Sequence, residues 1–130
     1  MSVALLAPGC GDSGRYRVSG RVTFDGQPVP VGTVTFLPLG AGDRDRSAGF
    51  CRIESGQFDS RAGRSPMDGR HRVLISGFDG VAYTSKIGDL LENNPEGRPL
   101  FPLYVVEVDI PTAQGTVLDC DVPKASSPQR

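Results

Sequence analysis

The chain has 130 residues and a formal net charge of -1, because its 14 Lys and Arg are balanced by 15 Asp and Glu. This length predicts one domain. The near-neutral charge argues against nucleic acid as the main partner, since phosphate binding needs a clear basic excess. The 17 Gly and 11 Pro are typical of many turns between short strands. No apolar stretch is long enough to span a bilayer as a helix.

The first residues resemble the end of a bacterial lipoprotein signal peptide. The apolar stretch Val3–Ala7 is followed by Pro, Gly and Cys10. In this interpretation residues 1–14 are a truncated signal and tether, cleavage falls directly before Cys10, and Cys10 carries the lipid. No Lys or Arg precedes the apolar stretch, so we expect translation to start upstream of Met1. The alternative is an apolar N-terminus with a chance cysteine.

Residues Tyr16–Leu39 contain two runs of alternating apolar and polar residues around a turn rich in Asp, Gly and Pro. Successive side chains of a strand point to opposite faces, so each run predicts a strand with one buried face. Asp25-Gly26 and the prolines after it end the first run, and the whole segment predicts a β-hairpin. Gly20 interrupts the apolar face of the first strand, where we expect a bulge or a close approach of another backbone.

Five further alternating runs follow. Together with the first two they predict an all-β fold, a seven-stranded antiparallel Greek-key β-sandwich over residues 15–123. The later runs are Ala48–Ile53, Gln57–Ser60, Arg70–Ser76, Leu103–Ile110 and Thr116–Val122. Residues 124–130 are polar, and we expect them to form a disordered tail.

The least regular segment is Phe78–Pro102. A connection this long is usually functional or locally folded. A short helix capped near Thr84 and continuing through Leu91 is expected here. Leu100-Phe101 is expected to pack against the sandwich.

The three cysteines divide into one candidate lipid site and one pair. If Cys10 carries lipid, Cys51 and Cys120 remain. Such a pair in an exported protein could form a disulfide, which would close a long loop and could contribute roughly 4 kcal/mol. The alternative is two buried free thiols that pack as small hydrophobic side chains.

No group of residues has the pattern of a catalytic, cofactor or metal site. His71, the one histidine, could act as a general base, but its place in an alternating run favours an aromatic-like core residue. A single histidine also argues against a zinc site. Asp43 and Asp45 could offer oxygens to calcium, but the arginines beside them favour a solvated loop.

Two surfaces are candidates for binding. Arg15, Arg17 and Arg21 line the polar face of the first strand and could bind an anionic glycan or a partner. Such residues more often keep a sheet face soluble. The segment Phe78–Pro102 carries several large apolar residues, which could form a binding surface or close one end of the core.

With the strands placed, the chain resembles small lipoproteins of planctomycete-type bacteria that carry a carboxypeptidase regulatory-like, transthyretin-like domain. The resemblance covers most of the chain and rests on Cys10, VSGRVTFDGQPVPVGTVTFLP, SGQFDS, DGRHRVLI and LFPLYVVEVDIPTAQGTVLDCDVP. It implies a prealbumin-like sandwich of seven strands outside the cytoplasm, and it implies no reaction. His71 departs from the family pattern, which usually has tyrosine at this position.

We therefore expect a non-catalytic lipoprotein of the cell envelope, anchored to a membrane on its periplasmic or surface face, without a cofactor. Its expected role is structural or in binding an envelope protein or a glycan. A rival expectation is a small-ligand carrier, which a ligand-sized apolar cavity would favour over a flat polar face. A third is a hydrolase like the transthyretin-like hydroxyisourate enzymes, whose several histidines and C-terminal tetrapeptide this chain lacks. The sequence predicts no oligomeric state.

Overall fold

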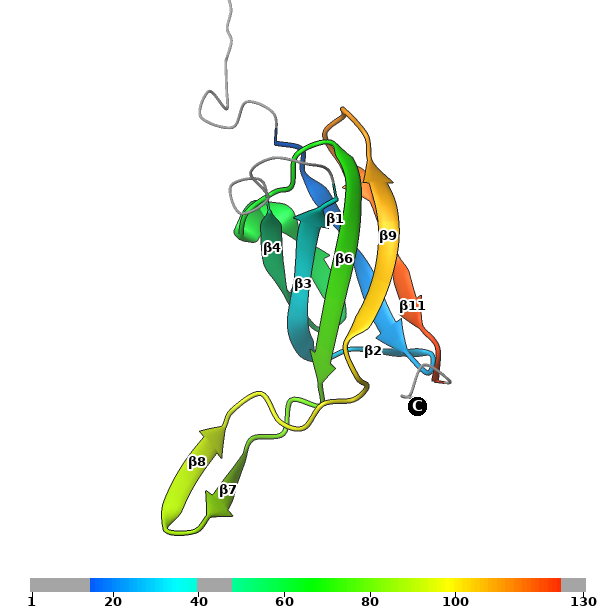
Figure 1. Ribbon diagram of the computed structural model, residues 1–130. Helices are drawn as coiled ribbons and strands as arrows, with labels where there is room; N and C mark the ends of the chain where they lie inside the picture. The colour runs from blue at the N-terminus through cyan, green and yellow to red at the C-terminus, as the bar shows by residue number, and fades with distance from the viewer. Residues whose placement is uncertain (1–14, 40–47, 125–130) are drawn as a thin grey trace, which may run out of the picture.

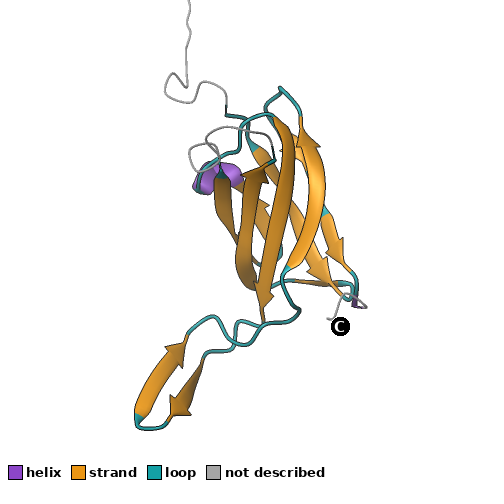
Figure 2. Cartoon of the chain, viewed as in Figure 1, coloured by secondary structure: helices purple, strands orange, loops and turns teal. Residues whose placement is uncertain are grey.

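The computed structural model describes residues 15–39 and 48–124, and these residues form an all-β fold (Figure 1). The all-β character expected from the sequence is thereby confirmed. One short 3-10 helix, η2, follows the fifth strand at Ser60–Ala62 (Figure 2). The strands are β1 (Val18–Phe24), β2 (Gln27–Pro28), β3 (Val31–Pro38), β4 (Gly49–Glu54), β5 (Gln57–Asp59), β6 (Gly69–Phe78), β7 (Tyr83–Ile87), β8 (Leu90–Asn94), β9 (Tyr104–Ile110), β10 (Thr116–Val117) and β11 (Cys120–Val122).

In the described part of the chain, all strands except β7 and β8 belong to one sheet. Its order is β10-β1-β5-β4-β3-β6-β9, and β2 and β11 also pair with β1. The sheet curves into a half-barrel, so that β3 and β6 lie opposite β1 and β11 (Figure 1). Both β10 and β11 run parallel to β1, which corrects the fully antiparallel arrangement expected from the sequence. The chain crosses from β9 at one edge to β10 at the other, and residue alternation carries no signal for strand direction.

One hydrophobic core lies inside the curved sheet, and the alternating runs predicted most of its members, Val29 and Phe101 being outside those runs. Val18, Phe36 and Val73 are fully buried in one cluster, and Val106 packs against it. The four residues come from β1, β3, β6 and β9, so strands distant in sequence meet through their predicted apolar faces. The other buried apolar members are Val22, Val29, Val34, Cys51, Ile53, Phe58, Ile75, Phe101, Ile110 and Val122.

The expected hairpin forms only as the short antiparallel pair of β1 and β2, and the second run, β3, does not pair with β1. Asp25 and Gly26 have positive φ angles of 54° and 78°, as a tight two-residue turn requires. The returning strand, β2, pairs with β1 only through Gln27 and Pro28, because proline cannot continue the ladder. Val29 then enters the core, and β3 pairs with β4 and β6 on the opposite side of the half-barrel.

Gly20 lies where another backbone approaches, as its position in the first run predicted. A Cβ atom at this position would lie 1.9 Å from the carbonyl oxygen of Leu118. The amide of Leu118 donates to the carbonyl of Ser19 at 2.7 Å. The ladder is interrupted at this approach, so the predicted single strand Thr116–Val122 is divided into β10 and β11.

The segment Phe78–Pro102 forms a projecting β-hairpin, β7–β8, so the expected helix is wrong. Gly88 at the turn has a φ of +62°, and this conformation favours a hairpin with Gly-Asp as its two-residue loop. The two strands β7 and β8 lie away from the core (Figure 1), where a helix would have no apolar surface against which to pack. Leu100 and the buried Phe101 pack against the core, which confirms that expectation.

Several expectations concern residues outside the described ranges. They are the lipid site at Cys10 with its tether, the loop carrying Asp43 and Asp45, and the tail beyond residue 124. Within residues 15–39 and 48–124, no helix has the length and apolar character needed to cross a bilayer.

Candidate functional site

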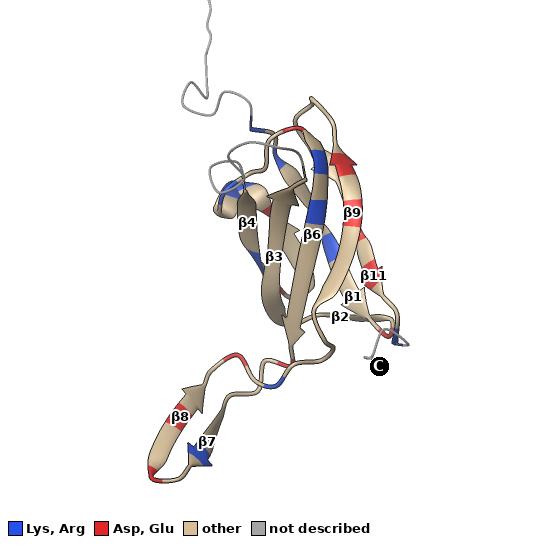
Figure 3. Ribbon diagram, viewed as in Figure 1, with Lys and Arg blue, Asp and Glu red and all other residues tan. Residues whose placement is uncertain are grey.

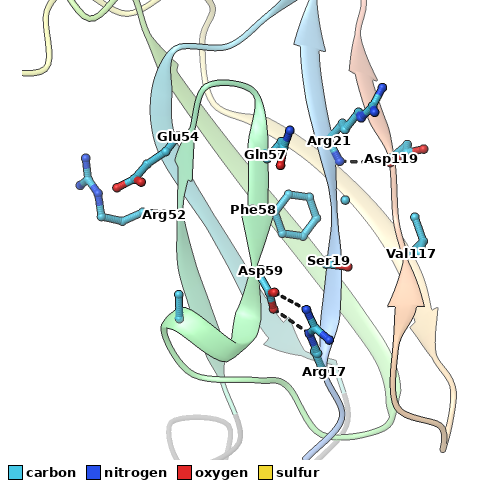
Figure 4. Close-up of a pocket in the computed structure, with 12 residues that line it drawn as sticks. Arg17, Ser19, Arg21, Arg52, Glu54, Gln57, Phe58, Asp59, Val117 and Asp119 are labelled. Atoms are coloured by element: carbon cyan, nitrogen blue, oxygen red, sulfur yellow. Dashed lines mark hydrogen bonds and ion pairs between the residues drawn. The ribbon is translucent and has the colours of Figure 1, made fainter.

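An open groove runs over the outer face of β1, β5 and β4, with the β10 segment along its other side (Figure 4). Its volume is about 780 Å³, which is within the range of small-ligand sites. Alternation places the polar residues of these strands on this face because their apolar neighbours fill the core. The lining residues are Arg17, Ser19, Gly20, Arg21, Arg52, Glu54, Gln57, Phe58, Asp59, Ala62, Val117 and Asp119.

An ion pair between Arg17 and Asp59 forms one end of the groove (Figure 4). The guanidinium donates to both carboxylate oxygens, at 3.0 Å from Nε and 2.5 Å from Nη2. The Asp59 carboxylate also accepts from the amide of Arg61 at 3.0 Å. The hydrogen bonds from Arg17 are the main cause that lowers the pKa of Asp59 to about 2. Asp59 is therefore a permanent anion at neutral pH and cannot serve as a general acid.

Hydrogen bonds from distant parts of the chain hold the strands around the groove. The amide of Arg21 donates to the Asp119 carboxylate at 3.0 Å. Gln114 bridges the segment before β1, accepting from the amide of Arg17 and donating to the carbonyl of Arg15, both at 2.8 Å. At the far side, Arg52 pairs with Glu96 from the base of the projecting hairpin at 2.8 Å.

Three polar groups in the groove point to solvent without a partner among the described residues. They are the Arg21 guanidinium, the Gln57 amide and the Glu54 carboxylate. Each can offer two hydrogen-bonding atoms in one plane. The groove thus combines a fixed ion pair with free donors and acceptors, which is an arrangement suited to a ligand with several hydroxyl groups.

The only histidine lies in the core, apart from the groove. The side chain of His71 on β6 is fully buried, and its Nδ1 lies 2.9 Å from the carbonyl oxygen of Gly69. Its Nε2 is buried and has no hydrogen-bond partner among residues 15–39 and 48–124. Since no solvent reaches the ring, His71 cannot contact a substrate without opening the core.

Both described cysteines are free thiols. Cys51 on β4 is buried and Cys120 on β11 is partly buried, and these strands do not pair with each other. Burial raises the pKa of the Cys51 thiol to about 12 and that of Cys120 to about 11. The structure therefore agrees with the second expectation for this pair, two free thiols that pack in or against the core. Neither thiol is an activated nucleophile, because burial favours its protonated form.

Sequence reasoning found one side of the groove and missed the other. Arg17 and Arg21 were predicted on the polar face of β1, whereas Arg15 does not line the groove and instead donates to the carbonyl of Ser65 at 2.7 Å. The carboxylates of Asp59 and Asp119 were missed, because they reach the groove only through the pairing of β5 and β10 with β1, and residue alternation does not predict which strands pair. Among residues 15–39 and 48–124, no three His, Cys, Asp or Glu side chains gather as a metal site would require.

No protein-family model and no curated protein matches the chain. Among solved structures, the chain is similar to a Pseudomonas aeruginosa protein that is described as a candidate carbohydrate-binding protein. The two share 11% sequence identity with a TM-score of 0.47, and the match covers 83% of this chain and 88% of the other. At this level of similarity the match carries no argument about the ligand of this chain.

Proposed function

We propose that the chain is a non-catalytic binding module of the cell envelope, whose groove binds a neutral glycan. The observation that supports this function is the open polar groove beside β1, with Arg21, Gln57 and Glu54 free to form hydrogen bonds. In this proposal the fold is a prealbumin-like sandwich, as in the lipoproteins that the sequence resembles, and a lipid at Cys10 holds it at the membrane.

Charge favours a neutral ligand over an anionic one. The groove is lined by three arginines and three carboxylates, the latter being Glu54, Asp59 and Asp119. The positive charge of Arg17 is already matched by Asp59 at hydrogen-bonding distance. An anionic glycan would meet no net positive potential, whereas hydroxyl groups can both donate to carboxylates and accept from guanidinium groups.

The alternative functions have less support. A carrier would need an enclosed apolar cavity, whereas this groove is open and lined largely by charged and polar side chains. A hydrolase would need an accessible base or nucleophile. His71 is buried and the two thiols are protonated at neutral pH. The Asp59 carboxylate is anionic, but a pKa of about 2 and the hydrogen bonds from Arg17 make it a weak base.

A titration followed by NMR tests the groove. We expect neutral oligosaccharides of glucose or N-acetylglucosamine to shift the amide signals of Arg21 and Gln57, with a Kd of about 1 mM. Arg21→Ala should weaken binding about tenfold, since it removes hydrogen bonds from a charged donor. Arg72→Ala is the matched control, because Arg72 lies on β6 outside the groove and pairs with Glu107.

Two results would overturn the glycan proposal. One is the absence of shifts in the groove with every neutral oligosaccharide at about ten times the expected Kd. The other is tighter binding of oligouronates than of neutral sugars. The envelope location is tested separately by labelled palmitate, which should enter the full-length protein expressed from its own gene and should not enter its Cys10→Ser variant.

A further inference from the structure

The hairpin formed by β7 and β8 projects from the half-barrel as an arm (Figure 1). The base of the arm is firmly attached to the body. Leu100 donates to the carbonyl of Gly77 at 2.9 Å, and the ring of Phe101 lies 5.1 Å from the ring of Phe24. The Asp79 carboxylate accepts from the amides of Val81 and Arg98 at 2.8 and 3.2 Å. The arm is therefore held out in a defined direction.

The outer part of the arm exposes large apolar side chains. Ile87, Leu90 and Leu91 are 67%, 74% and 71% exposed. These three residues flank the turn, and no other strand in the part of the chain that the structure describes pairs with β7 or β8. The arm therefore has both apolar surface and strand edges available for another chain. Because an isolated two-stranded hairpin is only marginally stable in water, pairing with another chain would also stabilise it.

The hydrogen-bonding edge of β7 can be derived from its turn. A two-residue loop makes Ile87 and Leu90 the first hydrogen-bonded pair of the hairpin. Pairs alternate along an antiparallel ladder, so Lys86 and Thr84 direct their N–H and C=O groups away from β8. The free edge of β7 is thus centred on Ser85, with one outward-facing residue on each side.

We propose that this edge pairs with the same edge of a second copy of the chain. The two β7 strands would run antiparallel about a two-fold axis at Ser85, and the arms would form one four-stranded sheet. Thr84 of each copy would face Lys86 of the other, which gives four hydrogen bonds across the axis. On one face, Ile87 of each copy would lie opposite Tyr83 of the other, an aromatic and β-branched pair of the kind that stabilises sheets.

The charges of the arm favour β7 over β8 as the contact. Basic Lys86 lies on β7, whereas acidic Glu92 lies at the centre of β8 (Figure 3). Pairing two β8 strands about their centre would place Glu92 opposite its own copy, and like charges directly opposite are destabilising. Insertion of the tip into a membrane would require burial of the Asp89 carboxylate in the turn, which is costly.

Two proline variants of the full-length protein test which edge is used. In Thr84→Pro and Asn93→Pro, the substituted amides belong to the same cross-strand pair of the hairpin, and both point away from it. Each variant also removes the same side-chain hydrogen bond between Thr84 and Asn93. Sedimentation should show a dimer for the parent chain and for Asn93→Pro. Thr84→Pro should weaken the dimer about tenfold or more, because two of the four hydrogen bonds across the axis are lost.

A cysteine pair gives a second, geometric readout. Ser85 would lie on the axis as a non-hydrogen-bonded pair with a Cα separation of about 4.5 Å, which a disulfide can span. In a Cys10→Ser background, Ser85→Cys should form covalent dimers under mild oxidation. Glu92→Cys, opposite Ser85 on β8, is the matched control and should not.

Three outcomes would overturn the proposal. The first is a parent chain that stays monomeric up to about 1 mM together with no cross-link from Ser85→Cys. The second is equal loss of association in both proline variants, since this would indicate head-to-tail pairing of β7 with β8. The third is association that disappears without vesicles and returns with them, since this would indicate a membrane as the partner of the tip. None of these results bears on glycan binding in the groove.

Discussion

Replacing Gly20 by alanine tests the closest backbone contact in the half-barrel. The new Cβ would lie 1.9 Å from the carbonyl oxygen of Leu118, so this oxygen would have to retreat by roughly 1.5 Å to reach ordinary van der Waals contact. That movement would strain the hydrogen bond from Leu118 to Ser19 and the bond from the Arg21 amide to Asp119. Losing both would cost about 2 kcal/mol.

Two further effects set the net change. Exposure of the partly buried Leu118 and Cys120 side chains would add about 1 to 2 kcal/mol. Alanine restricts the unfolded chain and returns about 0.4 to 1 kcal/mol. We therefore expect Gly20→Ala to lower the free energy of unfolding by about 2 to 3.5 kcal/mol, measured by urea denaturation with circular dichroism.

The neighbouring residue supplies the control. Ser19 faces the groove and not the approaching backbone, so Ser19→Ala should change stability by no more than about 0.5 kcal/mol. In the alanine variant of Gly20, the largest amide shifts should fall on residues 116–122. A change for Gly20→Ala as small as that for Ser19→Ala would show that this segment does not pack against β1 as described.

Three other substitutions or treatments probe separate features. Asp59→Asn should lower stability by about 1 kcal/mol or less above pH 4, because the ion pair is more than one-third exposed. The pKa of Asp59 is lower in the folded state than in the unfolded state, so protonation of the carboxylate removes the stabilising effect of the ion pair as pH falls towards 2. The stability difference between parent and variant should therefore vanish there. A constant difference at all pH values would contradict this. In a background lacking the N-terminal cysteine, Cys51 and Cys120 should resist iodoacetamide in the native state and both react after denaturation without reductant; a disulfide would leave neither reactive. Phe101→Ala should cost about 3 kcal/mol, as expected for a buried phenylalanine, and a near-neutral result in thermal melting would show that the base of the arm does not pack on the core.

The inward faces of the strands could be predicted from the sequence because a two-residue alternation is a local property. The parity of His71, Val73 and Ile75 placed all three side chains in the core, where the structure has them fully buried. The same alternation says nothing about which strands are neighbours. The pairing of β1 with β5, β10 and β11 therefore could not be predicted, and with it half of the groove was missed.

The sequence contains a local signal for the projecting hairpin, but the spacing of apolar residues in the same segment favoured a helix. Gly88-Asp89 is a two-residue sequence that favours a tight hairpin turn, and residues on both sides can form short strands. The expected helix relied instead on the spacing of apolar residues such as Ile87 and Leu91. That spacing predicts a helix only where a core is available to cover the apolar face, and here these side chains are exposed.

The position of β1 has a consequence for how the chain reaches its native state. Val22 pairs with Cys120, which follows it by 98 residues in the sequence. Contacts that span nearly the whole sequence form slowly, because a long loop must close before they contribute stability. A growing polypeptide would therefore lack the pairing of β1 with β11 until residues 120–122 have been synthesised, and β1 would have to wait for its last described partner strand.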